Sequence, residues 1–97
     1  MTKSIRDDIL LEAMQCITHD RAATHGDAED SFQTIADVWS WWLSNRPLSP
    51  LTAADVAMMM VLFKAGRICG NKTHEDNYVD LAGYAALAGE ISMKEDK

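Results

Sequence analysis

Residues 56–63 read VAMMMVLF, a run in which every side chain is apolar. A helix that is apolar on all sides has to be covered on all sides, so we expect the helix containing this run to lie at the centre of the fold. Its start is marked by Thr52 and Asp55, which have the spacing of a capping box with aspartate in place of the usual glutamate. Gly70 marks its end. The sequence therefore predicts a central helix over residues 52–69.

Helical patterns also occupy both flanks of the central helix. Ser4 can cap a first helix, and Pro47 and Pro50 end a second helix before the central one begins. Residues 19–26 have no helical periodicity and are predicted to form a loop. No segment alternates apolar and polar residues over the length of a strand, so the fold class is all-α and most simply an up-and-down bundle. The predicted helices cover residues 4–18, 27–44, 52–69 and 73–93.

Length and composition predict one ordinary globular domain. With 97 residues the chain has room for a single core. An apolar fraction of 47% with 25% charged residues is typical of a folded protein rather than a disordered one. We therefore expect one helical domain over residues 1–97. Cys16 and Cys69 stand alone within helical patterns and are predicted to be reduced thiols in the core.

Charge and hydropathy argue against two classes of partner. The formal net charge of −6 repels phosphate backbones, which disfavours nucleic acid as a partner. The amino terminus carries charged residues before any apolar run, and the longest apolar run is far shorter than the roughly 18 residues of a membrane span. We therefore expect a cytoplasmic protein without a signal peptide and without a membrane partner.

Two of the predicted helices carry more apolar or small side chains than one small domain can cover. Besides the central helix, the helix over 73–93 is rich in small side chains, which let another helix approach closely. These are Ala82, Gly83, Ala85, Ala86, Ala88 and Gly89. A homo-oligomer, either a dimer or a tetramer, is the simplest way to cover both helices.

Three tryptophans cannot share one stripe of a helix, because neighbouring positions are about 100° apart. They are Trp39, Trp41 and Trp42. Two interpretations remain open. Either one of them lies at an interface or pocket, where aromatic anchors are common, or Trp39 and Trp42 lie in the core with Trp41 partly exposed.

A polar row and two cations lie on the two helices that follow the prolines. Asp80 lies one turn after Asp76 and one turn before Tyr84, and packing residues continue that row, so Asp80 is expected to point inward. Lys64 and Arg67 lie on the central helix. In one interpretation Asp80 and Lys64 form a structural ion pair. In the other, the two aspartates hold Mg²⁺ while Lys64 and Arg67 receive the phosphate oxygens of a ligand.

A second polar cluster lies at the predicted start of the second helix and comprises His25, Gly26, Asp27 and Asp30. Acids at that position complement the positive end of the helix dipole, and this structural role would explain Asp27 and Asp30. His25 could instead act as a base or as a donor to phosphate. The histidines of the chain lack the paired ligand spacing of a zinc site.

Three blocks of the sequence resemble a family of small phage and prophage proteins that is known mainly as a domain of unknown function. The blocks are DRAATHGDAEDSF at 20–32, DVAMM at 55–59 together with Lys64 and Arg67, and HEDNYVDLAGY at 74–84. They cover nearly the whole chain after the first helix. The resemblance implies a phage-type protein in the host cytoplasm, and it brings no activity with it.

The chain is more distantly similar to the all-α nucleoside triphosphate pyrophosphohydrolases, the MazG and dimeric dUTPase group, and to phage nucleotide-modification-associated domains. Members of that group are helical oligomers that bind Mg²⁺ through a Glu-x-x-Glu pair and a later Glu-x-x-Asp pair and release pyrophosphate. The similarity implies that Asp27 and Asp30 stand for the first pair. It likewise implies that Asn77 and Asp80 stand for the second, although Asn77 lacks the charge of the group's glutamate.

The leading hypothesis is a phage-type protein that binds or hydrolyses a nucleotide, by metal-assisted attack of water on a phosphoanhydride. Its predicted residues are Asp80 and His25 for catalysis, Lys64, Arg67, Asn77 and Tyr84 for ligand binding, and Asp27, Asp30, Asp76 and Asp80 for Mg²⁺. Two alternatives remain: a binder that sequesters a nucleotide without cleaving it, and a structural or protein-binding helical oligomer. The residues leave open whether the protein is an enzyme.

Overall fold

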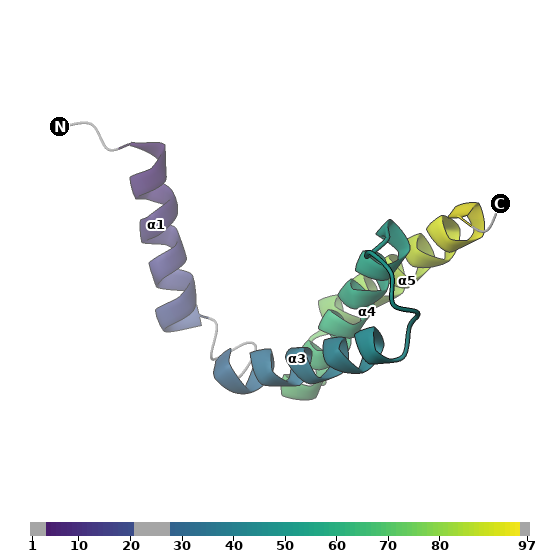
Figure 1. The fold of residues 1–97 in the computed structure, drawn as a ribbon. Coiled ribbons are helices and arrows are strands. Elements are labelled where there is room, and N and C mark those ends of the chain that lie inside the picture. The colour runs from purple at the N-terminus through teal and green to yellow at the C-terminus, as the bar shows by residue number, and fades with distance from the viewer. Residues whose placement is uncertain (1–3, 21–27, 96–97) are drawn as a thin grey trace.

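The computed structural model describes the backbone of residues 4–20 and 28–95, and within them the side chains of residues 4–18 and 30–95. Its four α-helices in these ranges are α1 (Ile5–Gln15), α3 (Ala28–Ser44), α4 (Ala53–Gly70) and α5 (Glu75–Glu95). One turn of π-helix, η1 (Cys16–Asp20), follows α1 directly. The described residues contain no strand, which confirms the predicted all-α fold class (Figure 1). No described helix combines the length and the hydropathy that a membrane span needs.

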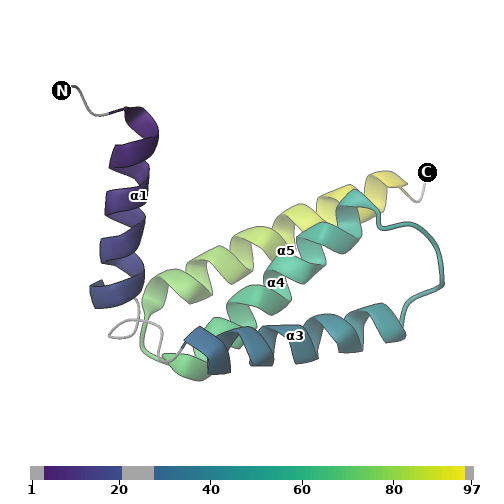
Figure 2. The same ribbon diagram turned by 60° about the vertical axis from the view of Figure 1, so that its left-hand side comes forward.

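α4 is the central helix, as its apolar run predicted. It lies between α3 and α5, and each neighbour runs antiparallel to it (Figure 2). On one side, Trp39 of α3 donates a hydrogen bond from Nε1 to the carbonyl oxygen of Met59 at 2.7 Å. On the other side, Lys64 of α4 pairs with Asp80 of α5. Three consecutive helices therefore form an up-and-down bundle.

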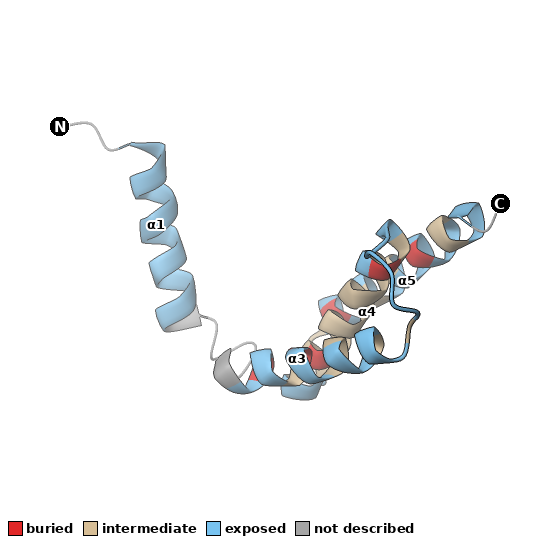
Figure 3. Cartoon of the chain, viewed as in Figure 1, coloured by how far each residue is buried: buried red, intermediate tan, exposed pale blue. Residues whose placement is uncertain are grey.

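The apolar run of α4 is only partly covered within one chain. The buried residues of this helix are Asp55 and Gly66. Val56 is exposed, and residues 57–63 are half-buried (Figure 3). The single chain therefore does not cover this helix on every side, because two neighbouring helices cover only two sides of a third.

α1 stands apart from the other three helices in both ribbon views (Figures 1 and 2). None of its residues is buried. The exposed large apolar side chains along α1 and η1 are Ile5, Ile9, Leu10, Leu11, Met14 and Ile17. A helix that buries nothing gains no stability from packing within its own chain.

Local capping sets the starts of α1 and α4, for which the sequence predicted a Ser4 cap and a Thr52–Asp55 capping box, and both starts are capping boxes in the structure. The hydroxyl oxygen of Ser4 accepts a hydrogen bond from the Asp7 N–H at 3.3 Å, and the Ser4 N–H donates to Asp7 Oδ2 at 3.2 Å. Thr52 and Asp55 exchange the equivalent bonds at the start of α4, at 3.2 and 2.9 Å. Aspartate therefore serves at both starts in the place where glutamate is usual.

Two other boundaries differ from the prediction. α5 begins at Glu75 rather than at residue 73, because the hydroxyl and the N–H of Thr73 donate to Asn71 Oδ1 instead of capping the helix. α1 ends at Gln15, and the π-helical turn extends to Asp20, so residues 19 and 20 are helical rather than part of the predicted loop. The rest of that loop, and the predicted helix start at Asp27, lie outside the described residues.

The core of the single chain is small. Among the described side chains, the buried apolar residues are Ile35 of α3 and Ala88 of α5. Cys16 and Cys69 are free thiols, but both are exposed, so their predicted place in the core is wrong. The physical reason is that Cys16 follows a helix that buries nothing, while Cys69 lies in the last turn of α4 beside other exposed positions.

The tryptophans match the second of the two interpretations in part. Trp39 and Trp42 are half-buried rather than in the core, and each donates a hydrogen bond to α4 from Nε1. Trp41 is 58% exposed, which is compatible with the first interpretation as well.

Candidate functional site

An ion pair joins α4 and α5 where the sequence predicted a polar site. Lys64 Nζ lies 2.9 Å from Asp80 Oδ2. The side chain of Lys64 is 12% exposed and that of Asp80 is 47% exposed, so the carboxylate is the solvent-facing member of the pair. The ion pair of the first interpretation is therefore present in the structure.

Asp80 does not point inward as the sequence suggested. The inward row of α5 consists of its buried and half-buried positions, at alternating spacings of four and three residues: Asn77, Leu81, Tyr84 and Ala88. Asp80 lies beside that row and its side chain reaches solvent. Sequence spacing could not separate the two rows, because Asp76 and Tyr84 are also one turn from Asp80.

Two cations lie over one aromatic ring near the end of α4. Lys64 Nζ is 5.5 Å from the centroid of the Phe63 ring, and the guanidinium carbon of Arg67 is 5.3 Å from it. The negative face of an aromatic ring attracts cations at such distances. Both positive groups therefore lie over the ring of Phe63. The position of Phe63 within the apolar run gave no sign of this role.

Asn77, in the first turn of α5, is 2% exposed, and its Nδ2 atom is buried with no acceptor among the described residues. The ion pair between Lys64 and Asp80 sets the register of the two antiparallel helices. Arg67, one turn later on α4, therefore lies level with Asn77, one turn earlier on α5. A buried donor without a partner costs on the order of 1–3 kcal/mol, so it is typical of a position at which a further group binds.

α3 brings another buried polar side chain to this region. Ser31 is 7% exposed and lies one turn before Ile35, which packs against Gly66 of α4. The start of α3, the end of α4 and the start of α5 meet there (Figure 2). Sequence reasoning missed Ser31, although its spacing of four from Ile35 was a signal for burial. We call this region the polar end of the bundle; it comprises Ser31, Phe63, Lys64, Arg67, Asn77 and Asp80.

The predicted metal ligands are not gathered within the described chain. Asp30 on α3 and Asp76 on α5 are both exposed. The described side chains, those of residues 4–18 and 30–95, include no group of three or more His, Cys, Asp or Glu residues that could hold a metal ion. Asp27 and His25 lie outside the described residues. The described carboxylates thus offer a sparse set, and Mg²⁺ would have to complete its shell with water and ligand phosphate.

Tyr84 lies beside the ion pair and is half-buried. It lines a shallow hollow of about 340 Å³ on the flank of α5, together with Val79, Asp80, Gly83 and Leu87. We call this the α5 hollow. Because Asp80 belongs both to the hollow and to the ion pair, the hollow adjoins the polar end.

A second ion pair, which the sequence did not predict, closes the connection between α3 and α4. Arg46 Nη2 lies 2.8 Å from Asp55 Oδ2, and Arg46 Nε donates to Asp55 Oδ1 at 2.9 Å. Asp55 also accepts hydrogen bonds from Trp42 and Thr52, and Arg46 donates to the carbonyl oxygen of Ser49. Since these groups satisfy one another, the cluster holds the proline-containing connection in place rather than a ligand.

The hydrogen bonds of this cluster favour the charged form of Asp55. The backbone N–H of Thr52 lowers the pKa of the Asp55 carboxyl most, desolvation opposes this effect, and Arg46 lowers the pKa further. The sequence indicated Asp55 as a capping residue but gave no sign of its bond to Arg46, nine residues earlier.

A family model described as "Domain of unknown function (DUF6378)" matches residues 8–92 of the chain. The chain is 36% identical over 89 residues to the Gene 55 protein of Mycobacterium phage L5, and 33% identical over 85 residues to the Gene 55 protein of Mycobacterium phage D29. These alignments cover 92% and 88% of the chain but 55% and 54% of the relatives, so the chain spans about half the length of the curated relatives it matches. No solved structure matches the chain. None of these descriptions names an activity.

Proposed function

The chain belongs to the family described as a domain of unknown function (DUF6378), and from that premise we propose that it is a phage-type protein that binds a nucleotide or another small phosphate ligand at the polar end of the bundle. The observation that carries the proposal is the buried amide of Asn77. Its Nδ2 has no acceptor among the described residues, and Asn77 lies three residues before Asp80, which pairs with Lys64. A phosphate oxygen is both an acceptor and an anion, so it suits both kinds of group.

Two cations at the polar end suit an anionic ligand. The chain as a whole carries a net charge of −6, yet Lys64 and Arg67 both lie over the Phe63 ring there. A lysine binds phosphate as a point charge, and an arginine binds it as a two-pronged donor. Because Asp80 is the solvent-facing member of its ion pair, it can turn outward while a phosphate oxygen takes its place at Lys64.

A more specific version of the proposal is that the protein hydrolyses the nucleotide. This version rests on the similarity to the MazG-like pyrophosphohydrolases. Water would attack phosphorus in a phosphoanhydride and pyrophosphate would leave, with His25 taking the proton of the water. The carboxylates proposed for Mg²⁺ are Asp27, Asp30, Asp76 and Asp80. Asn77 stands where that group has a carboxylate, and its amide brings no negative charge to a metal. The same residues support the alternative, a binder that sequesters a nucleotide without cleaving it.

Two readouts on one protein test the proposal: thermal shift and phosphate release, with nucleoside triphosphates and cyclic nucleotides, with and without Mg²⁺. Lys64→Gln removes the proposed phosphate contact, and Asp80→Asn removes the proposed metal ligand. Lys94→Gln is the matched control, because Lys94 is an exposed lysine that pairs with Glu90 in the last turns of α5. A bound nucleotide should raise the melting temperature of the wild type and of Lys94→Gln but not that of Lys64→Gln.

The two readouts separate the versions of the proposal. Turnover that is lost in Asp80→Asn supports hydrolysis, whereas a thermal shift without turnover supports the sequestering binder. If no nucleotide shifts the melting temperature of a wild-type protein that circular dichroism shows to be helical, both versions are wrong.

A structural or protein-binding helical oligomer is the second candidate function, and a different observation favours it. Trp41 on α3 is 58% exposed, and the apolar side chains of α1 have no cover within the described chain. Exposed apolar surface of this extent marks an interaction site.

A further inference from the structure

The chain exposes more surface than a compact monomer of its size. Its accessible surface is 7329 Å², whereas a folded monomer of 10.8 kDa exposes about 5,500 Å². Its radius of gyration is 16.7 Å, against about 12.5 Å for a compact chain of 97 residues. The excess of roughly 1,800 Å² is well above the roughly 800 Å² that each partner hides in a standard protein interface.

α1 presents an apolar face that nothing in the described chain covers. Ile5 and Ile9 form one row on it, and Leu10, Met14 and Ile17 form a second row one step round the helix. Asp8 and Glu12 lie opposite this second row, whereas Asp7 lies beside Met14. The row of Leu10, Met14 and Ile17 is therefore the side of α1 that is best suited to pack against another surface.

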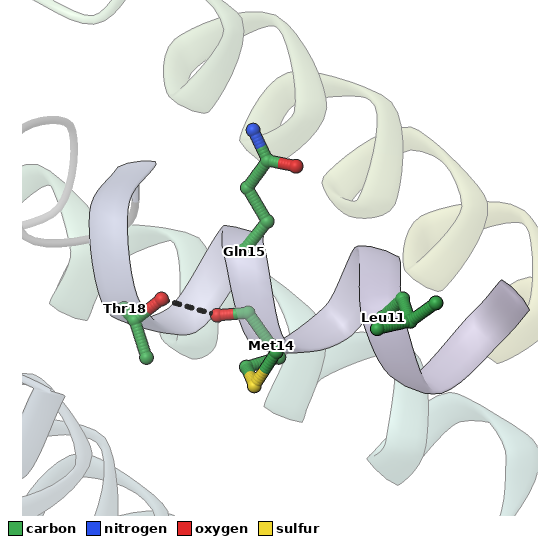
Figure 4. A pocket seen from close by; sticks show the side chains of 4 residues that line it. All are labelled: Leu11, Met14, Gln15 and Thr18. Carbon is green, nitrogen blue, oxygen red and sulfur yellow. Dashed lines mark hydrogen bonds between the residues drawn. The ribbon is translucent and has the colours of Figure 1, made fainter. Parts of the chain in front are cut away.

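The side chains at the end of α1 are arranged for such a contact. Leu11, Met14, Gln15 and Thr18 line a hollow of about 570 Å³ (Figure 4). The hydroxyl of Thr18 donates to the carbonyl oxygen of Met14, so this polar group is satisfied within the helix (Figure 4). The apolar side chains of Leu11 and Met14 are 46% and 55% exposed and can therefore receive a partner side chain.

The flank of α5 offers a complementary notch. Gly83 lies in the α5 hollow between Val79 and Leu87, which are 60% and 52% exposed. A Cβ atom at Gly83 would have no neighbour within 4 Å. A glycine between two exposed apolar side chains leaves a gap into which a large side chain of another helix fits.

We propose that two copies of this chain form a dimer in which α1 of each copy packs its row of Leu10, Met14 and Ile17 into the α5 hollow of the other. The exchange is symmetric, so each copy gives and receives the same contact. Apolar burial drives the association, because two chains that each carry a net charge of −6 repel one another. Two chains that each hide roughly 1,800 Å² fall within the range of about 2,000–5,000 Å² buried by obligate homodimers.

The occupant of the hollow is a second copy rather than the α1 of the same chain. Folding α1 back would leave the exposed apolar side chains on other sides of the bundle without cover. Outside α1 and η1 these are Phe32, Trp41, Leu43, Leu48, Leu51, Val56, Tyr78, Val79, Leu87 and Met93. They are spread over α3, α4, α5 and the connection between α3 and α4, so one short helix cannot reach them all. A second copy can cover these side chains with its whole bundle as well as with its α1.

Replacing Gly83 by leucine tests the proposal. The new Cβ atom has no neighbour within 4 Å in its own chain, and leucine is the better helix former, yet its side chain fills the notch that the partner's α1 would use. Light scattering after gel filtration should show the wild type at twice the chain mass of 10.8 kDa. Gly83→Leu should raise the dimer dissociation constant by about tenfold or more.

Gly89→Leu is the matched control. It makes the same replacement on the same helix, it also has no neighbour within 4 Å of the new Cβ, and it lies outside the residues that line the α5 hollow. This variant should keep the wild-type dissociation constant. An equal loss of dimer in Gly89→Leu and Gly83→Leu would contradict the assigned surface.

The α1 side of the contact is tested by Leu10→Gln/Met14→Gln, with Asp8→Gln/Glu12→Gln on the opposite side of the helix as control. The first pair should yield monomers, and the second should leave the dimer intact. A wild type that stays monomeric at every concentration overturns the proposal. So does a dimer that survives both Gly83→Leu and Leu10→Gln/Met14→Gln, because it would have to use another surface.

Discussion

Asp55 shows how one carboxylate can start a helix and make a tertiary contact at the same time. Its Oδ2 accepts the Thr52 N–H that begins α4, and both of its oxygens are held by Arg46. These bonds keep the pKa of the Asp55 carboxyl below its usual 3.8. The folded chain therefore gives up this proton at a lower pH than the unfolded chain does. Its contribution to stability is present above the usual pKa and is lost as the pH falls through the lowered one.

We predict that the free energy of unfolding of the wild type declines as the pH is lowered below about 4, because the unfolded chain takes up the Asp55 proton first. Asp55→Asn should be less stable at neutral pH and should decline less, since its amide does not titrate. Urea unfolding followed by tryptophan fluorescence measures both, and Trp42, which is bonded to Asp55 Oδ1, lies at the site. Asp37→Asn is the control, on an exposed acid of α3 bonded to Gln33. Equal losses in the two variants at neutral pH would contradict the prediction.

At the scale of the helices, the contact between α3 and α4 depends on the lack of a side chain at Gly66. A Cβ there would lie 3.0 Å from Ile35 Cγ1 and 3.7 Å from Ile35 Cα. Ile35 is buried and β-branched, so it has little freedom to move aside. Extra atoms in a packed contact cost about 1–3 kcal/mol, whereas alanine gains at most about 1 kcal/mol over glycine in a helix.

We therefore predict that Gly66→Ala lowers the free energy of unfolding by about 1 kcal/mol. Gly89→Ala should raise it by about 0.5–1 kcal/mol, because a Cβ at Gly89 has open space around it and only the helix propensity changes. Chemical denaturation of the wild type and the two variants gives the comparison. If Gly66→Ala were as stable as Gly89→Ala, the two helices would be packed less closely than the distance to Ile35 indicates.

The sequence predicted the positions of the helices in the chain better than it predicted what their side chains contact. Capping is local, so Ser4 could be recognised as a cap, and Thr52 and Asp55 as a capping box from their spacing of three residues. The start of α5 was misplaced because the side chain of Asn71 bonds Thr73, and that competition does not show in the spacing. The exposure of α1 was not predictable either, because rows such as Ile5 and Ile9 look the same whether they face their own core or a partner.

The candidate site was predictable in its residues but not in its geometry. Lys64 and Asp80 could be proposed as a pair because they carry opposite charges and lie on consecutive helices. The exposure of Asp80 depends on which row of α5 faces α4, and the way two helices cross decides that row. Phe63 was hidden because an aromatic residue in an apolar run gives no sign that cations lie over its ring.

At the scale of the whole molecule, stability should depend on concentration. The described side chains of one chain bury two apolar residues, Ile35 and Ala88, which is a small core for a domain of 97 residues. If α1 and the α5 hollow are covered by a second copy, folding and association are one reaction, and mass action favours the folded dimer as the protein concentration rises. Each tenfold rise then adds about 1.4 kcal/mol, which for two chains of this size corresponds to a melting temperature higher by roughly 3–6 °C.

Calorimetry of the wild type across a hundredfold range of concentration measures this slope directly. In Gly83→Leu the new side chain fills the α5 hollow, so the melting temperature of this variant should hardly change over the same range. Gly89→Leu should keep the wild-type slope. The comparison separates dimer formation from simple stabilisation, because both leucines favour the helix and one of them blocks the contact. A wild-type melting temperature that is independent of concentration would show that the exposed apolar face of α1 has no second copy to cover it.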